Sequence, residues 1–175
     1  MTRRAVQQLA LPGLATGERD RCMADPDGIA GGPASRHRAK GARRPARTIW
    51  RQNPREQGLI GLTDAIGWFG ANGYQVSLPL VDAQPYDLIV DDGVRLQRVQ
   101  VKTTTYRSPY GIFIVTLSTG GGNQSFHTVK PFDPTMTELL YVLTDDCCRY
   151  LVPTDRVASR RTLSLGARMR PYLVS

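Results

Sequence analysis

The first regular pattern of apolar positions begins near residue 53 and predicts an amphipathic helix. Its apolar residues recur every three or four positions, as on one helix face: Leu59, Leu62, Ile66 and Phe69. Asn53 and Pro54 supply an N-cap and a first-turn proline, Glu56 completes a capping box, and Asn72-Gly73 closes the helix. Because Glu56 lies three residues before Leu59, we expect it on the face that packs against the rest of the fold.

The segments that follow the helix predict the strands of a sheet. Their apolar residues alternate with polar ones or form short runs, over residues 74–78, 85–90, 94–104, 111–117, 139–143 and 148–152. Asp91-Asp92-Gly93 and Asp145-Asp146 are typical of hairpin turns, whereas Gly120-Gly121-Gly122 indicates a flexible loop. Glycines at positions 58, 61 and 67 of the helix favour close packing on such a sheet.

A helix followed by strands predicts one α/β domain over residues 51–160, with the N-terminal helix packed on a mixed β-sheet. Residues 161–175 are predicted to form a basic C-terminal tail. Residues 1–50 show no periodicity and hold ten Arg and Lys against four Asp and Glu, so they carry six of the net +8 charges. This composition predicts a flexible basic N-terminal arm, either a phosphate-binding tail or a solvated linker.

The composition also indicates the cellular compartment and limits the kinds of metal site that we expect. No apolar run approaches the ~20 residues that cross a bilayer, and the N-terminus lacks a secretory signal pattern. The three cysteines and two histidines have no spacing typical of a zinc site. We therefore expect a soluble, cytoplasmic protein that is not secreted, and the positive charge favours a polyanionic partner and association with the nucleoid.

The turn at Asp92-Gly93 sets the predicted register of the second and third strands. A two-residue loop makes Asp91 face Val94, and counting back places Asp87 opposite Arg98. Side chains alternate between the two faces of a strand. One face of this hairpin is therefore apolar and belongs to a core, and the other face is polar.

Four polar side chains are predicted to converge on that second face. Arg98, Gln100 and Lys102 share it on the third strand, and Asp87 is a diagonal neighbour of Gln100 at roughly 7–8 Å. Mg²⁺ takes oxygen ligands, which an aspartate, a glutamine carbonyl and a backbone carbonyl can supply. A lysine beside such a cation stabilises developing negative charge on a phosphate. Only three of the 23 basic residues are lysines, so Lys102 stands out among the arginines.

Glu56, Pro85-Tyr86-Asp87 and Gln100-Val101-Lys102 together resemble the PD-(D/E)XK nuclease superfamily, and within it the group I intron homing endonuclease branch. The resemblance covers residues 53–106 and implies a restriction-endonuclease-like core. It implies Asp87, Gln100 and the backbone carbonyl of Val101 as metal ligands and Lys102 as the catalytic cation. Glu56 would contribute to the metal site, by the resemblance, through a water molecule. The usual acid of the motif is replaced by glutamine at position 100.

We therefore expect an endonuclease that hydrolyses phosphodiester bonds in double-stranded DNA with Mg²⁺ or Mn²⁺. Five basic residues are candidates for phosphate contacts: Arg98, Arg107, Lys130, Arg160 and Arg161. The resemblance also suggests a homo-oligomer, because two strands must be cut.

Three alternatives remain open at this point. The first is a structure-selective nuclease similar to a Holliday-junction resolvase. The second is a DNA-binding relative whose catalysis is weakened by Gln100. The third is a structural domain that binds nucleic acid through its N-terminal arm. Each site residue also has a structural interpretation: Glu56 as a helix cap, Asp87 as a strand start, and Gln100 with Lys102 as the polar face of a half-exposed strand.

Overall fold

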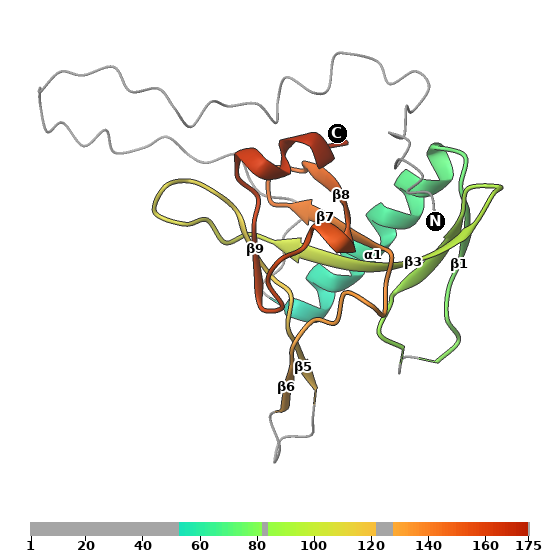
Figure 1. Ribbon diagram of the computed structural model, residues 1–175, viewed down its shortest axis with the longest axis horizontal. Coiled ribbons are helices and arrows are strands. Elements are labelled where there is room, and N and C mark those ends of the chain that lie inside the picture. Colours follow the sequence, from blue (N-terminus) through green and yellow to red (C-terminus); the bar gives the residue numbers. More distant parts are fainter. Residues whose placement is uncertain (1–52, 82–83, 122–127, 175) are drawn as a thin grey trace, which may run out of the picture.

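The computed structural model describes residues 53–81, 84–121 and 128–174 (Figure 1). The predicted basic arm, residues 1–50, lies outside the described residues. Within the described part, the chain forms a single long helix packed on a five-stranded mixed sheet, with smaller two-stranded sheets beside it. The predicted α/β class is confirmed. Among the described residues no helix is long and apolar enough to cross a membrane.

Helix α1, Pro54–Ala71, begins and ends where the sequence predicts. The Asn53 side chain caps it by accepting a hydrogen bond of 2.9 Å from the backbone N–H of Arg55. Phe69 of the predicted stripe is buried, and Leu62 and Ile66 pack against the core at its side, but Leu59 does not. The buried residues of the helix are Gly61, Ala65, Trp68 and Phe69, whereas Leu59 is 64% exposed. The predicted stripe was therefore wrong at Leu59, since small and aromatic residues form the contact instead.

The main sheet has the strand order β1-β2-β3-β7-β8. Its strands are β1 Gln75–Ser77, β2 Leu88–Asp91, β3 Leu96–Thr104, β7 Leu139–Thr144 and β8 Arg149–Pro153. Only the central pair β3 and β7 is parallel, and the other pairs are antiparallel. Since β2 pairs with the first half of β3 only, the second half of β3 has a neighbour on the β7 side and an edge on the β2 side.

Helix α1 covers one face of this sheet. An added Cβ at Gly61 would overlap with the Thr103 side chain, so glycine allows the helix to approach β3 this closely. The core on this face also includes Leu88, Val99 and Tyr141, all fully buried. Odd-numbered residues of β3 therefore face α1, and even-numbered residues face the other way.

A second apolar core fills the opposite face. Strands β4, Ile114–Thr116, and β9, Thr162–Ser164, pair with each other, and the 3₁₀ helices η2, Thr154–Arg156, and η3, Ala167–Tyr172, follow β8 and β9. Met169, Tyr172 and Leu173 pack against the core on this side. Residues 161–174, which we predicted as a basic tail beyond the domain, thus contribute a strand and a helix to the described fold.

A polar network that the sequence analysis did not identify ties α1 to the sheet. Arg149 donates to both carboxylate oxygens of Asp64, at 2.8 and 2.9 Å, and the Tyr141 hydroxyl donates to the same carboxylate at 2.6 Å. Burial, followed by the bond to Asp64, raises the pKa of Tyr141. Asp64 is therefore a structural carboxylate that fastens the helix to β7 and β8.

Candidate active site

The register of β2 and β3 places Asp87 closer to Gln100 than predicted. Leu88 pairs with Val99 and Asp91 with Leu96, so continuing the ladder puts Asp87 directly opposite Gln100. The predicted two-residue loop is wrong by two positions. The Asp92 side chain accepts hydrogen bonds from the backbone N–H groups of residues 94 and 95, which stabilises a longer turn of residues 92–95. The polar face of the hairpin is nevertheless the one predicted.

The carboxylate of Asp87 is held from β3 by two donors. The side-chain amide of Gln100 donates to Asp87 Oδ2 at 2.5 Å, and the backbone N–H of Val101 donates to the same oxygen at 2.6 Å. Asp87 in turn donates its backbone N–H to the Val99 carbonyl at 2.9 Å. Because a carboxylate only accepts, Gln100 presents its N–H group to Asp87, and the carbonyl oxygen is the end of its side chain with the chemistry of a metal ligand.

The backbone of β3 adds a further oxygen at the same edge. Alternate residues of a strand direct their N–H and C=O groups to the same side, and both the Val99 carbonyl and the Val101 N–H point to Asp87. The Val101 carbonyl therefore points to that side too, beyond the end of β2 at Leu88. This is the position in which the sequence analysis expects a carbonyl ligand.

Lys102 lies on the same face of β3, two residues beyond Gln100. It is half-buried, and its ammonium lies 3.5 Å from Thr119 Oγ1. Burial lowers the pKa of Lys102, and the negative charge of Asp87 opposes this by raising it. Thr119 was not identified from the sequence, because no local pattern links it to a residue 17 positions away.

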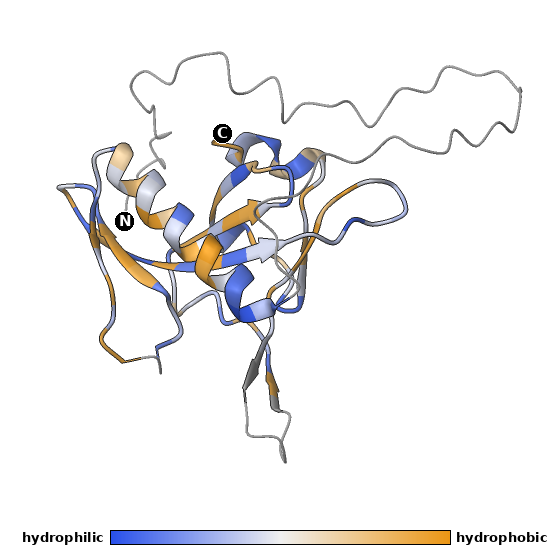
Figure 2. Ribbon diagram, turned by 180° about the vertical axis from the view of Figure 1, so that it is seen from behind, coloured by the Kyte–Doolittle hydropathy of each residue, from blue (hydrophilic) through white to orange (hydrophobic). Residues whose placement is uncertain are grey.

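Glu56 is exposed in the hydrophilic first turn of α1 (Figure 2). The helix covers the face of β3 that carries Thr103, whereas Gln100 and Lys102 lie on the other face. The expectation that Glu56 faces inward with Leu59 is therefore corrected. A contribution of Glu56 to the metal site stays a prediction.

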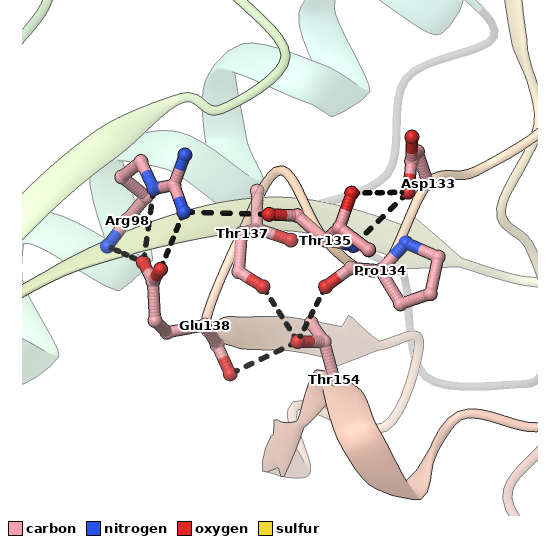
Figure 3. A network of polar contacts seen from close by, with 7 residues as sticks. All are labelled: Arg98, Asp133, Pro134, Thr135, Thr137, Glu138 and Thr154. Carbon is pink, nitrogen blue, oxygen red and sulfur yellow. Dashed lines mark hydrogen bonds and ion pairs between the residues drawn. The ribbon is translucent and has the colours of Figure 1, made fainter.

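Arg98, a predicted phosphate contact, is engaged within the fold (Figure 3). Its guanidinium forms a two-pronged ion pair with Glu138, at 2.5 and 3.1 Å, and also donates to the Thr135 carbonyl. The hydrogen bond to Glu138 raises the pKa of Arg98 and lowers that of Glu138. Arg98 therefore joins β3 to the segment before β7. A phosphate would have to displace the Glu138 carboxylate to bind this guanidinium.

The Arg98–Glu138 pair predicts a pH-dependent stability. Because the pKa of Glu138 is lowered from 4.5, its stabilising effect is present above that pH and is lost as the pH falls through the folded-state pKa. We expect Glu138→Gln to lower Tm by about 2–4 °C at pH 7, with the difference shrinking below pH 4.5. Thermal unfolding followed by circular dichroism checks this. Asp155→Asn, in the more exposed pair with Arg156, is the control, and a pH-independent difference would contradict the assignment.

The other predicted phosphate contacts divide into two groups. Arg107 pairs with Asp146 at 2.9 Å and lies 3.6 Å above the Phe113 ring, so it is used within the fold. Lys130, Arg160 and Arg161 are all exposed.

Backbone contacts bring these three exposed residues together. Lys130 pairs with Thr119, the Phe132 N–H donates to the Arg160 carbonyl, and the Leu117 N–H donates to the Arg161 carbonyl. They therefore flank the segment that contacts Lys102.

The donor set fits a hard divalent cation. Asp87 supplies a carboxylate, and the Gln100 and Val101 carbonyls supply neutral oxygens at the same strand edge. No group of three or more His, Cys, Asp or Glu side chains suited to a metal occurs in the part of the chain that the structure describes. One acid with two carbonyls is a weaker ligand set than several carboxylates, and it excludes the Cys- and His-rich sites that select zinc.

Comparison with known proteins identifies the family to which the chain belongs. The PD-(D/E)XK endonuclease family matches residues 52–171, which make up more than half of the chain. The chain belongs to this family. It is therefore an endonuclease of the PD-(D/E)XK type, and the resemblance noted in the sequence is confirmed at the level of the family.

A solved structure supports the fold of this PD-(D/E)XK protein. The bacterial homing endonuclease I-Ssp6803I is similar at 21% identity with a TM-score of 0.60, over 69% of this chain and 88% of that one. At this identity the similarity establishes the restriction-endonuclease-like fold. No curated protein matches the chain.

Proposed function

We propose that the protein is a metal-dependent endonuclease that cuts double-stranded DNA with Mg²⁺ or Mn²⁺ at Asp87, Gln100, Val101 and Lys102. The observation that carries the proposal is the hydrogen-bonded pair of Asp87 and Gln100 at the free edge of β3, with Lys102 on the same face. The family supplies the class of reaction, which is endonucleolytic cleavage.

Asp87 and the carbonyl oxygens of Gln100 and Val101 would hold the cation. When bound, a divalent cation polarises the phosphate and makes a nearby water molecule more acidic. The Val101 N–H and the Gln100 amide fix the Asp87 carboxylate in one orientation before any ligand arrives. Lys102 places its positive charge where negative charge develops on the phosphate oxygens during attack. Its partial burial strengthens that interaction, since water screens it less.

The exposed cations support a duplex substrate. Lys130, Arg160 and Arg161 flank the segment that reaches Lys102, so phosphates on either side of the cut would meet positive charge. Arg98 and Arg107 are left out of this proposed path because each is paired with a carboxylate of the fold.

The described part of each chain carries one proposed active site, and two such sites would cut the two strands of a duplex together. We therefore include self-association in the proposal, together with action on DNA in the cytoplasm, at the nucleoid. A structure similar to that of a homing endonuclease is compatible with a role in DNA mobility.

Gln100 makes a specific prediction about metal affinity. In Gln100→Glu the amide donor to Asp87 is replaced by a second carboxylate at hydrogen-bonding distance, which is repulsive until a cation binds. We expect a lower Tm than wild type in EDTA and a larger rise in Tm with added Mg²⁺, because metal affinity increases about tenfold or more. Thermal unfolding across a Mg²⁺ titration measures this. Equal Mg²⁺-induced shifts in both proteins would show that residue 100 is not a ligand.

The substrate is tested with a linear duplex and a four-way junction, each incubated with Mg²⁺, Mn²⁺ or EDTA. Metal-dependent cutting of the duplex supports the proposal. Cutting of the junction alone would instead assign a structure-selective nuclease. Binding of DNA without cleavage under every condition would contradict an active enzyme.

A further inference from the structure

A two-stranded ribbon stands apart from the main sheet. Strands β5, Thr119–Gly121, and β6, Thr128–Lys130, pair only with each other and project from the body of the protein (Figure 1). An isolated ribbon of two strands is marginally stable in water, and its apolar residue Val129 is 65% exposed. Such an element adds nothing to either core cluster, which suits it to contact with a ligand.

The ribbon begins at the active site. Thr119, its first residue, lies 3.5 Å from the Lys102 ammonium and pairs with Lys130, its last residue. A phosphate held at Lys102 is therefore at the root of the ribbon. The two strands extend outward from this root (Figure 1).

The ribbon segment carries positive charge at Lys130, and the next acid along the chain, Asp133, lies close enough to Arg160 for the arginine to help lower its pKa. Residues 117–132 contain no Asp or Glu. Arg160 and Arg161 lie beside the root of the ribbon, where their carbonyl groups accept backbone hydrogen bonds from Phe132 and Leu117 respectively. These basic residues favour a polyanion at the root of the ribbon.

We propose that the β5–β6 ribbon enters the major groove of the DNA next to the cut, which rests on the proposed function for the DNA substrate. The major groove, about 12 Å wide, admits a two-stranded ribbon, whereas the minor groove at about 6 Å does not. Phosphates on the two sides of the groove would meet Lys130 and the two arginines. Val129 would contact base edges, where an apolar side chain favours a thymine methyl group.

Binding of two duplexes tests the proposal. Both have the same sequence, but in one the cytosines carry glucosylated 5-hydroxymethyl groups, which fill the major groove. Fluorescence anisotropy is recorded with the full chain in EDTA, so that no cleavage occurs. The variants are Val129→Glu and the matched Val94→Glu. Val94 is 91% exposed in the turn before β3, at the opposite end of that strand from Lys102.

We expect wild type and Val94→Glu to bind the plain duplex at least about tenfold more tightly than the glucosylated one. Val129→Glu should bind the plain duplex about tenfold more weakly and lose that preference, while its Tm is unchanged. Equal binding of both duplexes by wild type, or a full preference in Val129→Glu, would overturn the proposal. Cleavage of unmodified plasmid with Mg²⁺ is measured in parallel. An enzyme that cuts but ignores glucosylation keeps its proposed function and loses the ribbon assignment.

Discussion

Lys102→Ala is expected to reduce the rate of DNA cleavage by about 10²–10³-fold, the effect of removing one fixed group that stabilises transition-state charge. The variant should bind duplex DNA nearly as well as wild type, since Lys102 is half-buried and contributes one charge among several. Single-turnover cleavage and anisotropy binding, at one salt concentration, separate these two effects.

Lys130→Ala is the matched control for this variant. Lys130 is exposed and pairs with Thr119, the residue that contacts Lys102, so both variants remove a lysine from the same region. We expect Lys130→Ala to weaken DNA binding and to reduce the salt dependence of binding. The rate at which bound DNA is cleaved should change little. If both variants lowered only the affinity, Lys102 would be a phosphate contact and not a catalytic residue.

Asp87→Asn is expected to lower metal-dependent cleavage by about 10³-fold, because the only carboxylate of the described ligand set is neutralised and metal polarisation is worth several kcal/mol. The substitution keeps the size of the side chain. Mg²⁺ should no longer raise Tm, so the loss can be assigned to metal binding. Cleavage rates and Tm are measured from zero to high millimolar Mg²⁺.

Asp91→Asn controls for the loss of one negative charge in the same segment, since Asp87 directly precedes β2 and Asp91 is its last residue. Asp91 ends β2 and accepts a 2.8 Å hydrogen bond from the Gly93 N–H, which an asparagine oxygen can also accept. Its cleavage rate and Mg²⁺ response should equal those of wild type. A Mg²⁺-induced rise in Tm that persisted in Asp87→Asn would place the metal elsewhere.

The polar face of β3 could be predicted because strand alternation is insensitive to an error of two in register. The turn at Asp92-Gly93 is longer than predicted, yet Asp87 still falls on the face of Gln100 and Lys102. A shift of one residue would have moved it to the other face. The shared face of Asp87, Gln100 and Lys102 therefore does not depend on the length of the loop.

Long-range partners could not be predicted in the same way. Gly61 meets Thr103, as close packing on a sheet predicts, but Gly58 and Gly67 have open space around them. Arg98 and Glu138 are 40 positions apart, so no local pattern predicts that they pair. The sequence therefore offered Arg98 as a phosphate contact, whereas in the fold it forms an ion pair.

The sequence at residues 120–122 was interpreted as a flexible loop. Gly120 and Gly121 belong to strand β5, since Gly120 pairs with Val129 and Gly121 with Thr128. Glycine disfavours strands when it is judged locally, and here the pairing with a segment several residues away overrides that preference.

A metal-dependent active site at Asp87 and Lys102 is best tested by cleavage of supercoiled plasmid with wild type, Lys102→Ala and Asp87→Asn. Each protein is stripped with EDTA and then supplied with Mg²⁺ or Mn²⁺, and nicked and linear products are separated on a gel. We expect wild type to give products only when metal is present. Both variants should lose those products while they still bind DNA. Cleavage that continues in EDTA, or that persists undiminished in either variant, would contradict a metal-dependent site at Asp87 and Lys102.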